Sequence, residues 1–147
     1  MPVAMTWLYE DRLFVVQFIG EVTLEDIENG ARKTHTMVED STAPTVHVIH
    51  DYSRMTGFPR SLRLISTLSR STLSHPRRGW IVAFGIQNTL AQFIAQGVTN
   101  MSQIHMRVVP TWEAALHTLT RIDIALPDNL QRPELLDEDA TMGHLLS

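Results

Sequence analysis

The sequence predicts an α/β fold: a single domain with one mixed β-sheet of about five strands and about four helices, in the order ββαβαβαβα. Three observations support this prediction. Two apolar stretches flank a tight Asp11-Arg12 break, as in a hairpin. Short β-branched apolar runs then alternate with segments of helical period. Finally, 147 residues with 44% hydrophobic composition suffice for one buried core.

The first helix follows the hairpin directly. Residues 5–10 and 13–20 are the two predicted strands, of which the second is the more apolar. Thr23-Leu24-Glu25-Asp26 then reads as a capping box in which Asp replaces the usual Glu. Gly30 falls inside this helix, and we expect it to be a point of close packing rather than a break.

Three further strands and three further helices follow in alternation. Pro59 suits the first turn of a helix, because its missing N–H would be unpaired there anyway. Thr111 is positioned to cap the last helix. The predicted strands cover residues 46–50, 80–85 and 106–109, and the predicted helices cover residues 59–74, 88–95 and 112–122.

After residue 122 the chain becomes acidic and is interrupted by prolines. We therefore divide it into a domain at 1–122 and an acidic C-terminal tail at 123–147, partly docked or disordered. The tail contains more apolar residues than a fully solvated segment needs, which favours partial docking: Leu126, Leu130, Leu135 and Leu136.

Charge is distributed unevenly along the chain. Residues 52–112 hold seven arginines and no Asp or Glu, whereas both flanking segments are acidic and the whole chain carries a net charge of −4. Arginine suits fixed pairing with carboxylates, so this block favours a protein partner with an acidic surface, or the chain's own tail. A pI near 5.9 and a single lysine argue against nucleic acid.

Composition excludes several other classes. The sequence contains no cysteine, which removes disulfides, thiolate metal sites and a cysteine nucleophile together. No apolar run approaches the length of a membrane span, and residues 1–5 do not resemble a signal peptide. We expect a cytoplasmic protein.

A family resemblance rests on the segments around the third strand and the last helix. Residues 46–51 form an apolar strand ending in Asp, Arg54-Met55-Thr56-Gly57-Phe58 occupies the following loop, and Trp112-Glu113-Ala114-Ala115-Leu116 opens the closing helix. This order resembles the sulfate transporter and anti-sigma-factor antagonist (STAS) family, over about residues 5–122. The resemblance implies a bacterial-type, non-enzymatic regulatory module that binds a protein partner.

The candidate interaction and switch loop follows from that resemblance. In the family, an Asp-Ser-Ser/Thr-Gly motif delivers a phosphorylated serine to a helix start, but Met55-Thr56 precedes Gly57 here. Only Thr56, Ser53 or Ser61 could stand in for the serine. The complete set of candidate residues is Asp51, Ser53, Arg54, Thr56, Phe58, Arg60, Ser61 and Arg63.

Other interpretations of the sequence remain open. His47 and His50 are three apart on a strand and point to opposite faces, so we predict no metal and no cofactor. An alternative function is the binding of a small apolar, lipid-like ligand, because seven methionines could line an adaptable pocket. A further alternative is a hydrolase that uses Asp51 and a histidine, although no nucleophile-elbow motif is present. A homodimer is compatible with each reading.

Overall fold

In the computed structural model, residues 3–59, 76–86 and 105–133 are described. They form a five-stranded mixed sheet in the order β1-β2-β3-β4-β5. The strands are β1 (Val3–Tyr9), β2 (Leu13–Glu21), β3 (Val46–Gly57), β4 (Arg78–Phe84) and β5 (Met106–Val109). β1 and β2 pair antiparallel, and all other neighbours pair parallel. This confirms the predicted mixed sheet of five strands.

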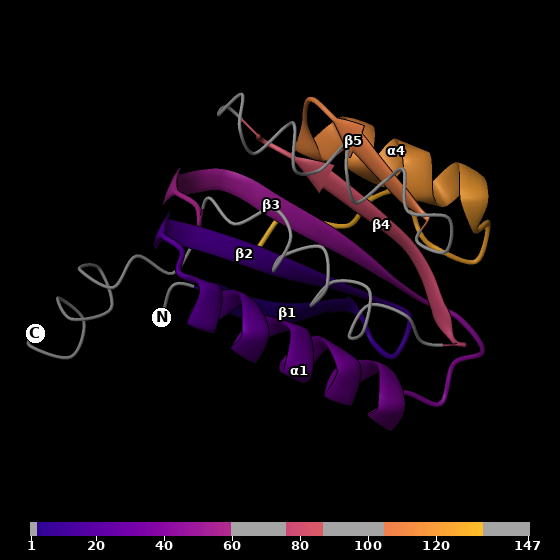
Figure 1. Ribbon diagram of the computed structural model, residues 1–147. Coiled ribbons are helices and arrows are strands. Elements are labelled where there is room, and N and C mark those ends of the chain that lie inside the picture. Colours follow the sequence, from indigo (N-terminus) through magenta and orange to yellow (C-terminus); the bar gives the residue numbers. More distant parts are fainter. Residues whose placement is uncertain (1–2, 60–75, 87–104, 134–147) are drawn as a thin grey trace, which may run out of the picture.

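Two helices lie on opposite faces of the sheet (Figure 1). Helix α1 (Leu24–Asp40) covers one face near β1, and helix α4 (Trp112–Ile122) covers the other. The predicted helices at 59–74 and 88–95 fall almost wholly outside the described residues. No helix in the described part of the chain is long and apolar enough to cross a membrane.

Local signals in the sequence account for both helix starts. The Asp26 carboxylate accepts from the Thr23 backbone N–H at 2.8 Å, and Thr23 Oγ1 accepts from the Asp26 N–H at 3.2 Å. The capping box is therefore complete even with Asp in place of Glu. Thr111 caps α4 in the same way, by accepting from the Ala114 N–H at 3.1 Å.

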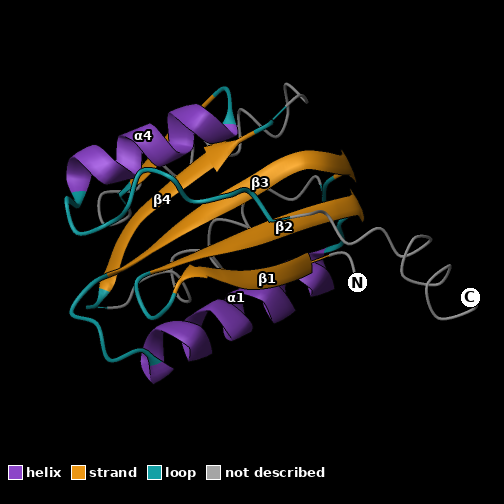
Figure 2. Cartoon of the chain, turned by 180° about the vertical axis from the view of Figure 1, so that it is seen from behind, coloured by secondary structure: helices purple, strands orange, loops and turns teal. Residues whose placement is uncertain are grey.

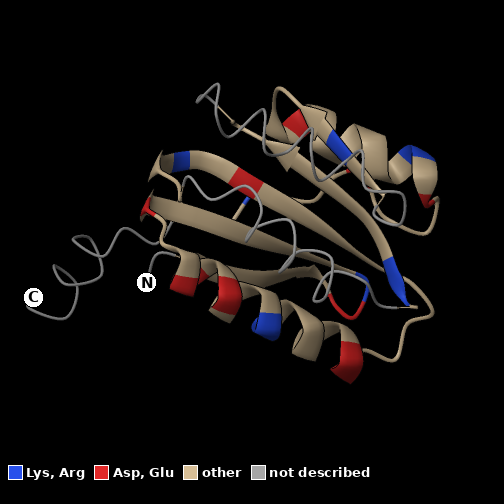
Figure 3. Cartoon of the chain, in the orientation of Figure 1, with Lys and Arg blue, Asp and Glu red and all other residues tan. Residues whose placement is uncertain are grey.

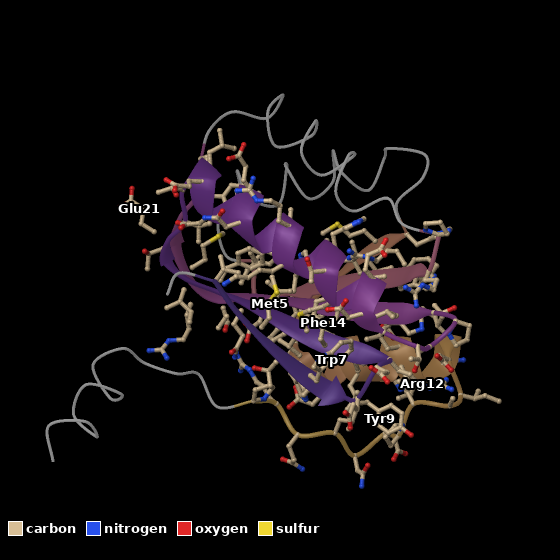
Figure 4. The ribbon with its side chains drawn as sticks, turned by 90° about the horizontal axis from the view of Figure 1, so that it is seen from below. Met5, Trp7, Tyr9, Arg12, Phe14 and Glu21 are labelled. Carbon is tan, nitrogen blue, oxygen red and sulfur yellow. The ribbon has the colours of Figure 1, made fainter. Side chains whose placement is uncertain are left out.

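The core has two layers, one on each face of the sheet. On the α1 side, Met5, Trp7 and Phe14 pack together, with the Trp7 and Phe14 rings edge-on at 5.2 Å (Figure 4). Gly30 of α1 is buried opposite Val3, so the expected close packing there is confirmed. The α4 side is built from a second group: Leu13, Val15, Ile49, Val82, Phe84, Trp112, Ala115, Leu119 and Leu126.

The segment after α4 contributes to that second layer. Residues 123–133 run back across the strands on the α4 face, toward the carboxyl ends of β2 and β3 (Figure 2). Leu126 is buried in the core, and Leu130 packs against it. We refer to residues 123–133 as the return segment.

One predicted boundary is wrong. The third strand does not end at His50, because β3 continues to Gly57. Asp51, Ser53, Arg54 and Thr56 therefore lie on a strand and not in a loop. The reason is the long neighbour β2, which pairs with β3 as far as Glu21 opposite Gly57. Two register shifts let β3 accommodate its turn-forming residues as bulges.

Candidate functional site

Asp51 lies on the α4 face in the middle of β3, opposite Phe84 at the end of β4, and only 1% of it is exposed. Its Oδ1 accepts from both the backbone N–H and the hydroxyl of Ser53, at 2.9 and 2.6 Å. Asp51 thus satisfies the bulged backbone beside it, as Asp commonly does at turns. The buried carboxylate fixes where the strand bends.

Arg132 reaches this carboxylate from the return segment. Its Nη2 donates to Asp51 Oδ2 at 2.9 Å and to Ser53 Oγ at 2.6 Å. The guanidinium also lies over the Phe84 ring, 5.1 Å from its centroid. Sequence reasoning missed Arg132 because it lies 81 positions from Asp51. The only signal available was a lone arginine in an acid-rich segment.

A cleft of about 720 Å³ opens beside this pair, between α4 and the return segment. Its lining residues are Ser53, Phe84, Gly85, Pro110, Thr111, Trp112, Glu113, Leu116, His117, Thr120, Asp128, Asn129, Leu130, Gln131 and Arg132. Gly85 has φ +77°, and a Cβ there would lie 2.8 Å from the Ser53 nitrogen. Only glycine therefore allows the chain leaving β4 to pass so close to β3.

Beyond Asp51, the end of β3 projects past β4. The last residue of β4, Phe84, is the register partner of Asp51, whereas β2 continues alongside β3 as far as Gly57. In this overhang Arg54 and Thr56 are exposed and Ser53 is partly buried, as is Phe58 just after the strand ends. The other candidate residues, Arg60, Ser61 and Arg63, lie outside the described residues.

On the opposite face of β3, His50 and Tyr52 form a polar pair that packs against an aromatic ring. His50 Nδ1 lies 3.1 Å from the Tyr52 hydroxyl, and the Tyr52 ring stacks on Phe18 at 4.6 Å. Burial, and then the charge of Arg78, lower the pKa of His50 to about 3. Burial also raises the pKa of Tyr52 above its usual value. Both groups are therefore neutral near pH 7.

His47, on the α4 face, ties three elements together. Its Nδ1 accepts from the Trp80 backbone N–H at 2.9 Å, so the proton of the neutral ring sits on Nε2, which faces Asp123 Oδ2 at 3.2 Å. Burial lowers the pKa of His47, against the opposing effect of Asp123. A Cβ at Gly79 would overlap the His47 ring, so this position requires glycine.

The side chains of His47 and His50 thus lie on opposite faces of the sheet, as their spacing on a strand predicted. Among the described residues, no group of three or more His, Asp or Glu side chains is arranged to hold a metal ion. Asp51 is hydrogen-bonded by Ser53 and Arg132, and no histidine in the described ranges lies against it.

Comparison with known proteins shows which solved structures have a similar fold. No protein-family model and no curated protein matches the sequence. Among solved structures, an uncharacterized protein of the DUF3478 family from Shewanella loihica PV-4, described as having a SpoIIAA-like fold, superimposes with a TM-score of 0.56. The two share 13% identity, over 80% of this chain and 91% of the other.

A second solved structure points the same way. The anti-sigma factor antagonist SpoIIAA in its unphosphorylated form superimposes with a TM-score of 0.55 at 16% identity, over 85% of this chain and 99% of that one. At such identities the likeness concerns the fold alone. It confirms the STAS-like resemblance expected from the order of elements: the chain has a SpoIIAA-like fold.

Proposed function

We propose that this protein is a non-enzymatic regulatory module that binds a protein partner through the overhang of β3 and the segment that follows it. The observation that carries the proposal is the overhang itself, in which residues 52–57 extend past β4 with β2 as their strand neighbour. A projecting strand end with exposed side chains offers both backbone and side-chain groups to a partner.

The chemistry of this surface suits an acidic partner. Arg54 is exposed on the overhang, and Arg60 and Arg63 follow within nine positions of it. No Asp or Glu occurs between residues 52 and 112. Phe58 adds an aromatic ring at the point where β3 ends. Arginine and aromatic residues are enriched at protein interfaces.

The likeness to an anti-sigma factor antagonist supports a regulatory role at the level of fold. The state of Asp51 supports a non-enzymatic one, because both of its oxygens are engaged by Ser53 and Arg132. A carboxylate already paired with a guanidinium is poorly suited to serve as a general base.

Of the three hydroxyl groups considered for phosphorylation, Thr56 is the exposed one on the overhang. Ser53 donates to Asp51 and accepts from Arg132, so a kinase would have to break both contacts to modify it. We therefore propose Thr56 over Ser53 as a regulatory hydroxyl. A phosphate there would change the charge of the surface that meets the partner.

Site-specific photo-crosslinking in the source cells tests the proposal. A photoreactive residue at position 54 or 56 should capture a protein that the same residue at Lys33, exposed on α1, does not capture. The purified partner should then bind R54A/T56A at least tenfold more weakly than K33A. Equal affinity of the two variants would refute the proposed surface.

A further inference from the structure

Arg78, the first residue of β4, extends over the α1 face of the sheet. Its register partner is Val46, which belongs to the core layer on that face together with Val48 and Ile81. The start of β4 is basic and lies at the end of the sheet where α1 ends (Figure 3). Neighbouring Arg77 has a different role, because it donates to backbone carbonyls at the end of α1.

The guanidinium of Arg78 is buried and has no hydrogen-bond partner in the described part of the chain. Its three nitrogens, Nε, Nη1 and Nη2, are all shielded from solvent, and none is hydrogen-bonded to any described residue. A guanidinium carries five N–H donors and a permanent charge. Taking such a group out of water is unfavourable unless an acceptor of opposite charge replaces the water.

Two effects on pKa values agree with this picture. Burial lowers the pKa of Arg78 itself to about 10. The same positive charge contributes to the lowered pKa of His50, which places the guanidinium near the His50–Tyr52 pair. Both neighbours are neutral near pH 7, so neither compensates the charge.

The sequence restricts where a counter-charge could come from. Segments 60–75 and 87–104 contain no Asp or Glu, and no carboxylate among the described residues pairs with Arg78. Within the chain, only the acids beyond residue 133 remain: Glu134, Asp137, Glu138 and Asp139. The simplest alternative is an anion from outside the chain.

We propose that Arg78 is the anchor of an anion-binding site on the α1 face, which takes the carboxylate or phosphate head group of a small ligand. The apolar side chains on the same face of the sheet, Val46, Val48 and Ile81, favour a ligand whose remaining part is apolar. This site is separate from the overhang of β3 and does not depend on the proposed protein partner.

Calorimetry and thermal unfolding of the full chain test the site with two probes, inorganic phosphate and sodium decanoate, each against sodium chloride at equal ionic strength. At least one probe should bind with a stoichiometry of one and raise Tm. Binding of decanoate but not phosphate would identify an amphipathic ligand, and binding of phosphate alone would identify a head group only.

Two variants keep the test decisive. R78M should weaken binding at least tenfold while leaving the ligand-free protein as stable as the wild type or more so, because it removes an uncompensated buried charge. R77M is the matched control and should bind like the wild type. Undiminished binding by R78M, or no response of the wild type to either probe, would overturn the proposal.

The chain's own acids are tested with E134Q/D137N/E138Q/D139N in the full-length protein. If the ligand comes from outside, this variant should bind the probe as the wild type does. If instead it binds phosphate or decanoate while the wild type does not, the C-terminal acids supply the counter-charge, and the external-ligand proposal is wrong.

Discussion

Asp51 and Arg132, which are 81 residues apart in the sequence, form an ion pair of 2.9 Å between Oδ2 and Nη2. The carboxylate is buried and the guanidinium is about one-third exposed. The pair joins the return segment to the central strand of the sheet. Because Ser53 contacts both partners, the three side chains form one unit.

The ion pair leads to the first prediction. Arg132→Met should lower the free energy of unfolding by about 1–2 kcal/mol, because it leaves a buried carboxylate with one oxygen unsatisfied while partial exposure moderates the loss. Urea denaturation measures this change. Arg121→Met, at an exposed position on α4, is the control and should cost less than about 0.5 kcal/mol. Equal losses in the two variants would contradict the importance of the pair.

A second prediction concerns the hydroxyl of Ser53. Ser53→Ala should cost about 1 kcal/mol through the loss of its hydrogen bonds. Ser53→Asp should cost more, because it brings a second carboxylate against Asp51. Thr56→Asp, on the exposed overhang, should stay within about 0.5 kcal/mol of the wild type. From highest to lowest, the expected order of unfolding midpoints is therefore T56D, S53A, S53D. A higher midpoint for S53D than for S53A would contradict this order and show that Arg132 can satisfy two carboxylates.

Gly79 gives a third prediction. Gly79→Ala should destabilise the fold by about 1–3 kcal/mol, because the added Cβ would overlap the His47 ring. In a His47→Ala background the same change should cost less. Gly57→Ala is the comparison, since the nearest atom to its Cβ would be Cγ of the flexible Glu21 side chain, at 3.2 Å. A cost for G79A that is unchanged by H47A would place the strain elsewhere.

The buried histidines predict how stability depends on pH. The folded-state pKa of His50 is lowered to about 3 and that of His47 is also lowered, both from an ordinary value of 6.5. Below pH 6.5 the unfolded chain therefore binds protons that the folded chain does not. For His50 the resulting stability is complete above pH 6.5 and is lost as the pH falls from 6.5 toward 3, by about 1.4 kcal/mol per pH unit.

Denaturation midpoints measured between pH 7.5 and 4.5 test this dependence. His50→Gln cannot titrate and should flatten the slope, whereas His117→Gln, at an exposed position on α4, should leave it as in the wild type. A slope that survives in the H50Q/H47Q double variant would assign the acid sensitivity to other groups.

Features set by neighbours in the sequence were predictable. The Thr23 and Thr111 caps, the tight Asp11-Arg12 turn and the strand at 106–109 depend on residues within a few positions of each other, and each lies where it was expected. The opposite orientation of His47 and His50 likewise follows from the two-residue period of a strand.

Features set by distant partners were not predictable in the same way. Asp51, Ser53 and Gly57 have turn propensity, yet they lie on β3 because β2 runs alongside that strand and pairs with it as far as Glu21 opposite Gly57. The contact of Arg132 with Asp51 depends on where the return segment crosses the sheet, which no local pattern encodes. The burial of Arg78, which has no hydrogen-bond partner among residues 3–59, 76–86 and 105–133, is equally unpredictable from a sequence in which it is one of seven arginines in a segment without acids.

The return segment is held at both ends by one strand. His47 meets Asp123 near the amino end of β3, Asp51 meets Arg132 opposite the carboxyl end of β4, and Leu126 is buried between them. Surface connections usually tolerate insertions and deletions. Here, however, the distance along β3 fixes the number of residues between the two contacts. In related sequences, the spacing from Asp123 to Arg132 should therefore vary less than the residues that fill it.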